Sequence, residues 1–401
     1  MKKELTLEKV YQAAYTLKDI VRKTEVMIAS GLTDNCDLYL KTENLQVTGS
    51  FKVRGASYMM STLSKKEKEK GVIACSAGNH AQGVALAAKE NGIHATIFVP
   101  DTAPISKVEA TKKYGAEVVL VNGVYDDAYE AAQKMQKETG KTFIHPFGDI
   151  AVIAGQGTVG LEIVEQVPDV EAIVVPVGGG GLISGIAYTV KKLKPSCKVY
   201  GVQAKGAACM VNSINEGHLC NTDCVSTFAD GIAVKNPSGT TYDICKEYVD
   251  EMVYVTDDEI AGSILSLIEQ QKLIAEGAGA VAVAAILNDK LPVKNKKVVA
   301  VVSGGNIDVN ILSRVIHRGL LSSGRKSDLN IEMIDRPGQL KEISSIIADL
   351  GANVVRVNHN YGGENTDINE CSLRISMETK NHEHLSEIKQ AITNAGYRIV
   401  N

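Results

Sequence analysis

The strongest constraint on the fold of this chain is the alternation of short apolar runs with longer amphipathic stretches rich in alanine. We predict strands in the short runs, which are rich in β-branched residues: 72–75, 95–99, 117–121, 142–145, 172–177, 198–204 and 298–303. Helical patterns such as 81–89 and 126–137 lie between them. Apolar strands separated by helices predict a parallel sheet covered on both faces, and therefore an α/β fold. Ligands of such folds bind in loops at the carboxyl ends of the strands.

The pattern changes near residue 322. Residues 323–328 are small and polar, and we expect them to be a linker between a first domain, 1–322, and a second, 329–401. In the second domain we expect, in chain order, strand 329–334, helix 338–349, strands 353–358 and 370–377, helix 384–395 and strand 398–400. This βαββαβ order is typical of a ferredoxin-like arrangement.

Composition and charge exclude several classes of protein. The 401 residues carry a net charge of −4 without a block of Lys or Arg, which argues against nucleic acid or an anionic membrane as the main partner. No run approaches about 18 uncharged apolar residues, and the N-terminus lacks the apolar run of a signal peptide, so we expect neither a membrane span nor export. The eight cysteines are scattered through a long chain, and we expect reduced thiols in the cytoplasm. Cys220 and Cys224 lack a second pair with zinc-ligand spacing, so we expect no metal.

Four consecutive glycines follow the predicted strand 172–177. The loop leads into a predicted helix at 183–192 and consists of Gly178, Gly179, Gly180, Gly181 and Leu182. Such a run costs backbone entropy and places no side chains, but it lets backbone N–H groups surround an anion at a helix N-terminus. A tight turn, the alternative, needs only one or two glycines. We therefore predict a phosphate site, and the absence of a following Lys-Ser/Thr pair argues against a nucleoside-triphosphate loop.

Residues 155–160 match the dinucleotide-binding pattern G-x-G-x-x-G, but their surroundings do not. Asp149 is a predicted helix N-cap, and Ile150, Val152 and Val159 fit a helix that has already begun. No predicted strand runs directly into the first glycine, as a dinucleotide site requires. We therefore interpret these glycines as positions of close helix packing.

Lys52 lies between apolar neighbours, just after a Thr-Gly loop. A lysine held in an apolar pocket loses its proton easily and can act as a nucleophile or a base. The pattern is weak on its own, because most lysines are solvated. Together with a phosphate loop and without a nucleotide motif, it suggests pyridoxal phosphate, which needs a Schiff-base lysine and a phosphate cradle.

Two more loops at strand ends carry polar residues. Residues 76–80 end one predicted strand and open a helix, where bare backbone suits a substrate carboxylate and Asn79 can offer its amide to a cofactor ring. The alternative for Asn79 and His80 is helix capping. Ser303 follows another strand, and its neutral hydroxyl could bond a pyridine nitrogen without keeping it protonated, which favours elimination over transamination. The alternative for Ser303 is an ordinary strand-to-helix turn.

These motifs occur together with two others in a fixed order. In chain order they are Ser50-Phe51-Lys52, Ser76-Ala77-Gly78-Asn79-His80, the glycine loop, Asp230-Gly231-Ile232-Ala233, Glu276-Gly277-Ala278 and Ser303-Gly304-Gly305-Asn306. Over residues 1–322 the set resembles the fold-type II pyridoxal-phosphate enzymes, and most closely the threonine dehydratases. The resemblance implies a two-lobed α/β fold of the tryptophan synthase β type, with a small lobe at about 50–145 and a large lobe formed by the remainder. It also implies a homodimer or homotetramer.

The second domain has a resemblance of its own. Its residues 335–340, with the sequence Asp-Arg-Pro-Gly-Gln-Leu, look like the first turn of an ACT-type regulatory domain. Such domains bind an amino acid near the Pro-Gly turn, often across an interface between domains. The residues implied to bind an effector here are Gly338 and Asn353. The alternative is a domain that only builds the oligomer.

The resemblance also implies a reaction and residue roles. The reaction is β-elimination and deamination of L-threonine to 2-oxobutanoate and ammonia, with L-serine also converted to pyruvate, in amino-acid catabolism or isoleucine biosynthesis. Lys52 would carry the cofactor and then remove the substrate Cα proton, and the cofactor phosphate would protonate the leaving hydroxyl. The residues implied to bind the cofactor are Lys52, Phe51, Asn79, Gly178, Gly179, Gly180, Gly181, Leu182 and Ser303. Those implied to bind the substrate are Ser76, Gly78, Asn79 and His80.

Departures from related families bear on the alternatives. Ala77 stands where similar serine racemases carry a serine base, which weakens racemisation. Gln203 and Cys209 stand where those racemases carry acidic metal ligands, so we expect no divalent metal there. Glu276 either orients the cofactor ring or is a helix-end carboxylate. The open alternatives are an L-serine dehydratase or serine racemase of the same fold, and a non-catalytic amino-acid sensor.

Overall fold

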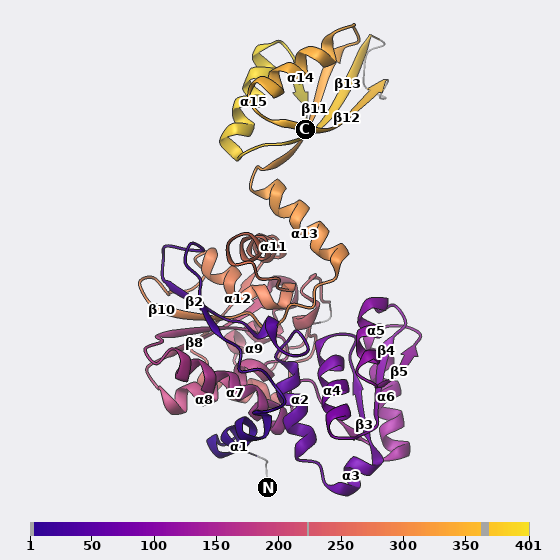
Figure 1. Cartoon of the computed structure of the whole chain (residues 1–401), viewed down its shortest axis with the longest axis vertical. Coiled ribbons are helices and arrows are strands. Elements are labelled where there is room, and N and C mark those ends of the chain that lie inside the picture. The colour runs from indigo at the N-terminus through magenta and orange to yellow at the C-terminus, as the bar shows by residue number, and fades with distance from the viewer. Residues whose placement is uncertain (1–3, 223, 362–368, 401) are drawn as a thin grey trace. The chain divides into compact units, whose positions relative to one another are not determined.

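The computed structural model describes residues 4–222, 224–361 and 369–400. The chain divides into two compact units, Met1–Val309 and Asn310–Asn401. The first unit contains two sheets. Figure 1 shows the labelled strands of these sheets on either side of helix α2 (Lys52–Ser61), which packs against helices of both lobes. In the part of the chain that is described, no helix is both long and apolar enough to cross a membrane.

The larger sheet has the strand order β1-β2-β10-β7-β8-β9. Its strands are β1 (Val26–Ile28), β2 (Asp37–Lys41), β7 (Ala172–Pro176), β8 (Lys198–Ala204), β9 (Glu251–Val255) and β10 (Lys297–Val301). All neighbours pair in parallel except β1 with β2. Every residue of β7 is buried, as expected for a strand covered on both faces. The predicted α/β fold with a parallel sheet is confirmed.

The smaller sheet has the order β5-β4-β3-β6, and all of its pairs are parallel. Its strands are β3 (Val72–Cys75), β4 (Ala95–Pro100), β5 (Glu117–Val121) and β6 (Thr142–Phe143). The predicted strand 142–145 is therefore shorter than expected, although Ile144 N still bonds the Ile73 carbonyl at 2.8 Å. Every residue of β3 is buried, so the loop that follows this strand starts from a fixed position.

Helices cover both sheets of the first unit. They are α1 (Leu7–Leu17), α2, α3 (Lys65–Lys70), α4 (Asn79–Glu90), α5 (Ile105–Lys113), α6 (Tyr125–Thr139), α7 (Ile150–Gln166), α8 (Gly181–Leu193), α9 (Cys209–Glu216), α10 (Gly239–Tyr248), α11 (Asp257–Ser266) and α12 (Gly277–Leu287). Asp149 caps α7 by accepting from Ala151 N at 2.7 Å, as predicted. A Cβ added to Gly155 would lie 2.7 Å from the Arg54 carbonyl of α2. The interpretation of residues 155–160 as a site of close helix packing is thus confirmed.

After its first helix, the second unit has the predicted βαββαβ order. Its elements are α13 (Val309–Ser322, whose first residue belongs to the first unit), β11 (Lys326–Ile334), α14 (Gln339–Asp349), β12 (Asn353–Tyr361), β13 (Glu370–Glu378), α15 (His382–Asn394) and β14 (Arg398–Val400). Its antiparallel sheet has the order β12-β13-β11-β14.

The predicted linker at 323–328 needs a correction. Residues 326–328 belong to β11, where Lys326 pairs with Glu378 and Asp328 with Ser376. The buried position of this stretch is occupied by Ser327, which is not apolar, so the alternation typical of a strand is hidden in the sequence. The compact units also separate at Val309, before α13, rather than at residue 322.

Candidate active site

Loops at the carboxyl ends of strands meet at the start of α2. Phe51 N donates to the carbonyl of Ser303, which follows β10, at 3.1 Å. Gly83 of α4 comes so close to the Lys52 backbone that an added Cβ would lie 3.1 Å from it. The structure therefore brings Lys52, the loop that opens α4 and the loop after β10 together, although they are far apart in the sequence.

Lys52 is the first residue of α2, and its amine is held in the protein interior. Its Nζ donates to the Pro146 carbonyl at 3.1 Å and lies 5.2 Å from the centre of the Phe51 ring. Burial lowers the pKa of this amine to about 8, although the nearby carboxyl of Glu276 acts in the opposite direction. About a tenth of the amine is therefore unprotonated at pH 7, far more than for a solvated lysine, and this is the form that a nucleophile or a base requires.

Asn79 begins α4 and is held by two side chains from distant segments. Its Nδ2 donates to Glu276 Oε1 at 2.5 Å, and its Oδ1 accepts from Asn306 Nδ2 at 2.8 Å. Asn306 also donates to the Thr48 carbonyl at 2.8 Å. Within the described residues, the amide of Asn79 donates one hydrogen bond, so its second N–H is available to a ligand. The side chain of Asn79 binds these distant residues and does not cap α4, which argues against the capping alternative.

Glu276 directly precedes α12, but its carboxyl group bonds Asn79 instead of capping that helix. Burial raises the pKa of Glu276 to about 7, and the negative charge of Asp230 acts in the same direction. A Cβ added to Gly304 would lie 2.3 Å from Glu276 Oε1, so this glycine is needed for the close approach. Of the two roles left open by the sequence, the geometry argues against a helix-end carboxylate, because Glu276 holds Asn79 instead, and the orientation of a cofactor ring stays a prediction.

Ser303 is buried at the end of β10. Its Oγ lies 3.3 Å from the Ala278 carbonyl at the start of α12, to which it donates. A hydroxyl can rotate and also has acceptor lone pairs, so this bond does not prevent a second one to a ligand. The structure places Ser303 against the Phe51–Lys52 segment. A residue that binds the ring of a cofactor attached to Lys52 would need to lie there.

The glycine loop follows β7 and leads into α8. Its carbonyls are engaged: Gly178 O accepts from Gln203 at 3.4 Å, Gly179 O from Thr241 at 2.7 Å and Gly180 O from Ser184 at 2.9 Å. The amides of the first turn of α8 have no acceptor within the helix and carry its positive dipole end. The carbonyls of the loop are thus bonded to protein groups, whereas amides at the start of α8 remain for a ligand. This is the arrangement of an anion-binding site, which we call the anion cradle.

Close packing also explains why the loop needs glycines. A Cβ added to Gly179 would lie 2.4 Å from the Phe147 ring, and one added to Gly181 would lie 2.9 Å from the Phe147 backbone. Gly180 has φ +88°, a conformation that other residues rarely adopt. Phe147 was not singled out in the sequence, because nothing in its local pattern indicates that it faces this loop.

The predicted substrate residues follow β3. Ser76 Oγ accepts from Gly78 N at 3.2 Å, and a Cβ added to Gly78 would meet no atom within 4 Å, so the backbone there is open. His80 is buried, with Nε2 at 2.9 Å from the Ile144 carbonyl. Burial lowers the pKa of His80 to about 3, and the nearby Lys52 charge acts in the same direction. His80 is therefore neutral at physiological pH and anchored to the end of β6, and its contact with a substrate stays a prediction.

Gln203 and Cys209 take part in protein contacts. Gln203 Oε1 accepts from Met210 N at 2.9 Å and Val211 N at 2.8 Å, which caps the start of α9. Cys209 Sγ lies 3.2 Å from the Val234 carbonyl. The two positions hold α9 and the following loop in place.

Gly338 and Asn353 lie at opposite ends of the second unit's sheet. Asn353 pairs with Glu378 and donates to its carboxylate at 3.0 Å. Gly338 comes after Ile334, which pairs with Glu370 at the other end of β13. These ends are roughly 25 Å apart along strands of this length. A single copy of this unit therefore does not bring the two residues to one site, and their binding of an effector stays a prediction.

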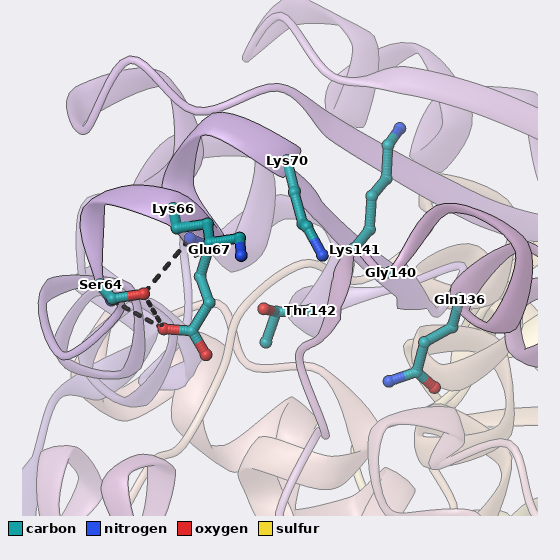
Figure 2. A pocket seen from close by; sticks show the side chains of 8 residues that line it. All are labelled: Ser64, Lys66, Glu67, Lys70, Gln136, Gly140, Lys141 and Thr142. Carbon is teal, nitrogen blue, oxygen red and sulfur yellow. Dashed lines mark hydrogen bonds between the residues drawn. The ribbon is translucent and has the colours of Figure 1, made fainter.

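The structure also has a hollow of about 560 Å³ on the small lobe, away from the predicted loops. It is lined by Ser64, Lys66, Glu67, Lys70, Gln136, Gly140, Lys141 and Thr142. Figure 2 shows Ser64 and Glu67 bonded to one another, and this pair is the capping box of α3. None of these residues belongs to the candidate active site.

Comparisons with known proteins identify the family to which the chain belongs. Residues 17–304 match the family described as pyridoxal-phosphate dependent enzyme, and residues 322–396 match the ACT domain. The chain is 50% identical over 397 residues to an L-threonine ammonia-lyase of Thermotoga maritima, covering 98% of this chain and 99% of the relative.

Two solved structures are similar to more than three quarters of this chain. Threonine deaminase isoform 2 of Solanum lycopersicum, in its processed form, has a TM-score of 0.74 and 39% identity, covering 78% of this chain and 94% of the other. Maize serine racemase has a TM-score of 0.75 and 34% identity, covering 79% of this chain and 98% of the other.

Proposed function

The chain belongs to the pyridoxal-phosphate dependent enzymes, and from this membership we propose that it is an L-threonine ammonia-lyase, which converts L-threonine to 2-oxobutanoate and ammonia. The observation that carries the proposal is the buried Lys52 amine of lowered pKa, which lies beside the loops of Asn79 and Ser303. Identity over nearly the full length with the Thermotoga maritima relative supports threonine as the substrate. L-Serine, which has the same β-hydroxyl group, is a second substrate that would give pyruvate.

The residues present fit pyridoxal phosphate. When bound, this cofactor supplies an electron sink for the negative charge that develops at the substrate Cα. Lys52 would hold it covalently, the amides from Gly178 to Leu182 would hold its phosphate, and Phe51 would pack beside it. The second N–H of Asn79 and the hydroxyl of Ser303 would bond the ring. The fit rests on the anion cradle before α8, in which glycine is required at several positions.

The chain's own residues then account for elimination. The Lys52 amine, released when the substrate amine takes its place, would take the proton from the substrate Cα, and the β-hydroxyl would take up a proton and leave as water. Glu276 keeps Asn79 in position through the 2.5 Å bond. Ser303 cannot hold a pyridine nitrogen protonated as a carboxylate would, which favours elimination. Ala77 offers no group that could move a proton on the opposite side, which disfavours racemisation.

The test is the absorbance spectrum of the purified full chain before and after L-threonine is added, with 2-oxobutanoate, pyruvate and D-serine quantified. We expect a visible cofactor band that changes on addition, and a higher kcat/KM for L-threonine than for L-serine. Faster formation of D-serine than of pyruvate from L-serine would favour the racemase alternative. A protein that stays colourless with pyridoxal phosphate would overturn the proposal and leave the amino-acid sensor.

Attachment of the cofactor to Lys52 will depend on pH. Burial lowers the pKa of this amine to about 8, and only the unprotonated amine attacks an aldehyde. The rate constant for loading the cofactor-free chain will therefore rise about tenfold per pH unit below pH 8 and level off above it. It can be measured by trapping the adduct with borohydride after timed mixing and locating it by mass spectrometry. A rate that keeps rising to pH 10 would indicate an ordinary solvated lysine.

A Gly179→Ala variant will bind pyridoxal phosphate at least about tenfold more weakly. The added methyl would lie 2.4 Å from the Phe147 ring, so either the loop or the ring must move, and the amides before α8 lose their arrangement. The dissociation constant can be measured by titrating the cofactor-free chain. Gly262→Ala in α11 is the matched control, because its added Cβ meets no atom within 4 Å. Equal affinities in the two variants would contradict the phosphate role of the loop.

Regulation, assembly and location are further parts of the proposal. The match to the ACT domain supports an amino-acid effector, and one that touches both Gly338 and Asn353 would have to lie between two copies of this unit. We propose a homodimer or homotetramer on that basis.

All eight cysteines are free thiols, which supports the cytoplasm as the compartment. The test of the effector is to titrate isoleucine, valine and threonine while activity is followed. Inhibition by isoleucine would indicate a biosynthetic role rather than a catabolic one. The ACT domain proposal fails if none of the three changes activity.

A further inference from the structure

Three side chains from neighbouring strands converge at one end of the second unit's sheet. Asp335 directly follows β11, His359 lies on β12 and Cys371 lies on β13. One carboxylate oxygen, one imidazole nitrogen and the sulfur all lie within 4.8 Å of one another. None of the three belongs to the predicted catalytic or effector residues.

The sheet holds these groups in a fixed arrangement. The central strand β13 pairs with β11 on one side and β12 on the other. His359 pairs with Leu373, which is two residues from Cys371 on the same face, so both side chains leave the sheet on that face. Asp335 N bonds the Asn369 carbonyl at 2.9 Å, which continues the ladder to the end of the cluster. Backbone bonds therefore position all three groups before any ligand is present.

We propose that Asp335, His359 and Cys371 bind a divalent transition-metal ion of the zinc class. Oxygen, nitrogen and sulfur ligands in one site are typical of zinc, with bonds of about 2.0–2.3 Å. Two ligands on one such tetrahedral ion are roughly 3.3–3.8 Å apart, so small side-chain rotations close the site from its present spacing. Three protein ligands leave the fourth position for water or another small ligand.

The surroundings suit the binding of a cation. Tyr361 Oη lies 3.3 Å from His359 Nδ1, a contact that helps to orient the ring. The Cys371 thiol is buried. On binding, the S–H bond is replaced by a bond from sulfur to the metal, and the proton goes to solvent. One carboxylate and one thiolate then balance the two positive charges of the ion.

The chain contains a second group of the same donor types, which serves as a matched control. Glu216 is the last residue of α9, and His218 and Cys220 lie on the irregular segment that follows it. Glu216 Oε2 lies 3.3 Å from Cys220 Sγ and 3.4 Å from His218 Nε2, so these groups already contact each other. They are held by a helix end and an irregular segment rather than by three paired strands. Pre-organisation therefore favours the cluster on the sheet.

The test is zinc binding by the full chain after chelator treatment, measured by equilibrium dialysis and elemental analysis. We expect one zinc ion per chain whose dissociation constant rises at least tenfold in both His359→Ala and Asp335→Asn, and is unchanged in His218→Ala. His359 and Asp335 are exposed, so neither substitution removes core packing. X-ray absorption should show one sulfur ligand, which Cys371→Ser removes and Cys220→Ser retains.

Zinc binding that is undetectable in the wild-type chain, or that His359→Ala leaves unchanged, would overturn the proposal. This holds even if Cys371→Ser fails to fold, because the decision rests on the exposed histidine. The site does not depend on the proposed catalytic function, since the measurement reads metal content and not activity.

Discussion

A Lys52→Ala variant will form 2-oxobutanoate from L-threonine at least about 10³-fold more slowly than the wild-type chain. The substitution removes both the group that would attach the cofactor and the base that would take the Cα proton. The measurement is kcat with saturating pyridoxal phosphate, together with the visible spectrum. The band of the lysine-attached cofactor should be lost, although the phosphate cradle can still retain the cofactor without a covalent bond.

The matched control is Lys89→Ala, which removes an exposed lysine at the end of α4 and should leave kcat unchanged. Lys52→Arg separates the two properties of the side chain, since it keeps a positive charge but cannot attach the cofactor. It should be as inactive as the alanine variant. Substantial activity in either Lys52 variant would show that another group is the base and would remove the central element of the proposed mechanism.

An Arg54→Ala variant will lose about 3–5 kcal/mol of the free energy of unfolding, because it leaves a buried carboxylate without its partner. Arg54 and Glu43 have side chains that are 1% and 0% exposed, with Arg54 Nε 2.8 Å from Glu43 Oε2. Arg54 also binds Glu162 of α7 at 2.6 Å, and Lys41 of β2 binds the same carboxylate at 2.6 Å. The network therefore joins the helix that carries Lys52 to the large lobe.

Because the stability lost in Arg54→Ala is electrostatic, its size depends on pH. Burial alone would raise the pKa of Glu43, but Arg54 and Lys41 hold it below its ordinary value. A carboxyl with a lowered folded-state pKa stabilises the fold above its unfolded pKa, and this contribution disappears as the pH falls through the folded value. The difference in stability between wild type and Arg54→Ala should therefore be full at neutral pH and shrink in acid.

Urea unfolding followed by tyrosine fluorescence measures this difference, since the chain has 14 tyrosines and no tryptophan. Lys23→Ala is the control, because it also deprives a carboxylate of α7, Glu165, of a 2.6 Å partner, but at an exposed site. It should change the free energy of unfolding by no more than about 1 kcal/mol. Equal losses in the two variants would show that burial of the network does not determine its contribution.

Several parts of the site could be predicted because consecutive residues carry their characteristic pattern. The glycine loop is visible because four glycines in a row place no side chains, and its position between β7 and α8 is as expected. The packing role of residues 155–160 could be predicted because Asp149 is a cap in its own local pattern. The βαββαβ order of the second unit follows from periodicity in the same way. Each of these signals lies within a window of about ten residues.

Other features had no local signal. The strands β1, β2 and β9 were not predicted. β1 has only three residues, and β2 and β9 include charged residues such as Lys41 and Glu251, so only pairing with neighbours makes them strands. The bond from Asn306 to Asn79 joins residues 227 positions apart. No pattern in one sequence indicates which of two asparagines will orient the other.

The sequence alone determined the alternation of strands and helices and the family resemblance, and it predicted the glycine loop as an anion site and Lys52 as the reactive lysine, because these depend on residue type and short spacing. Only the tertiary structure decided the pairing of Glu276 with Asn79, the contact of Phe147 with the glycine loop and the separation of Gly338 from Asn353. It also brought Asp335, His359 and Cys371 together. The physical reason is that a side chain's partners, burial and pKa depend on which distant segments pack against it, and strand order and register set those neighbours.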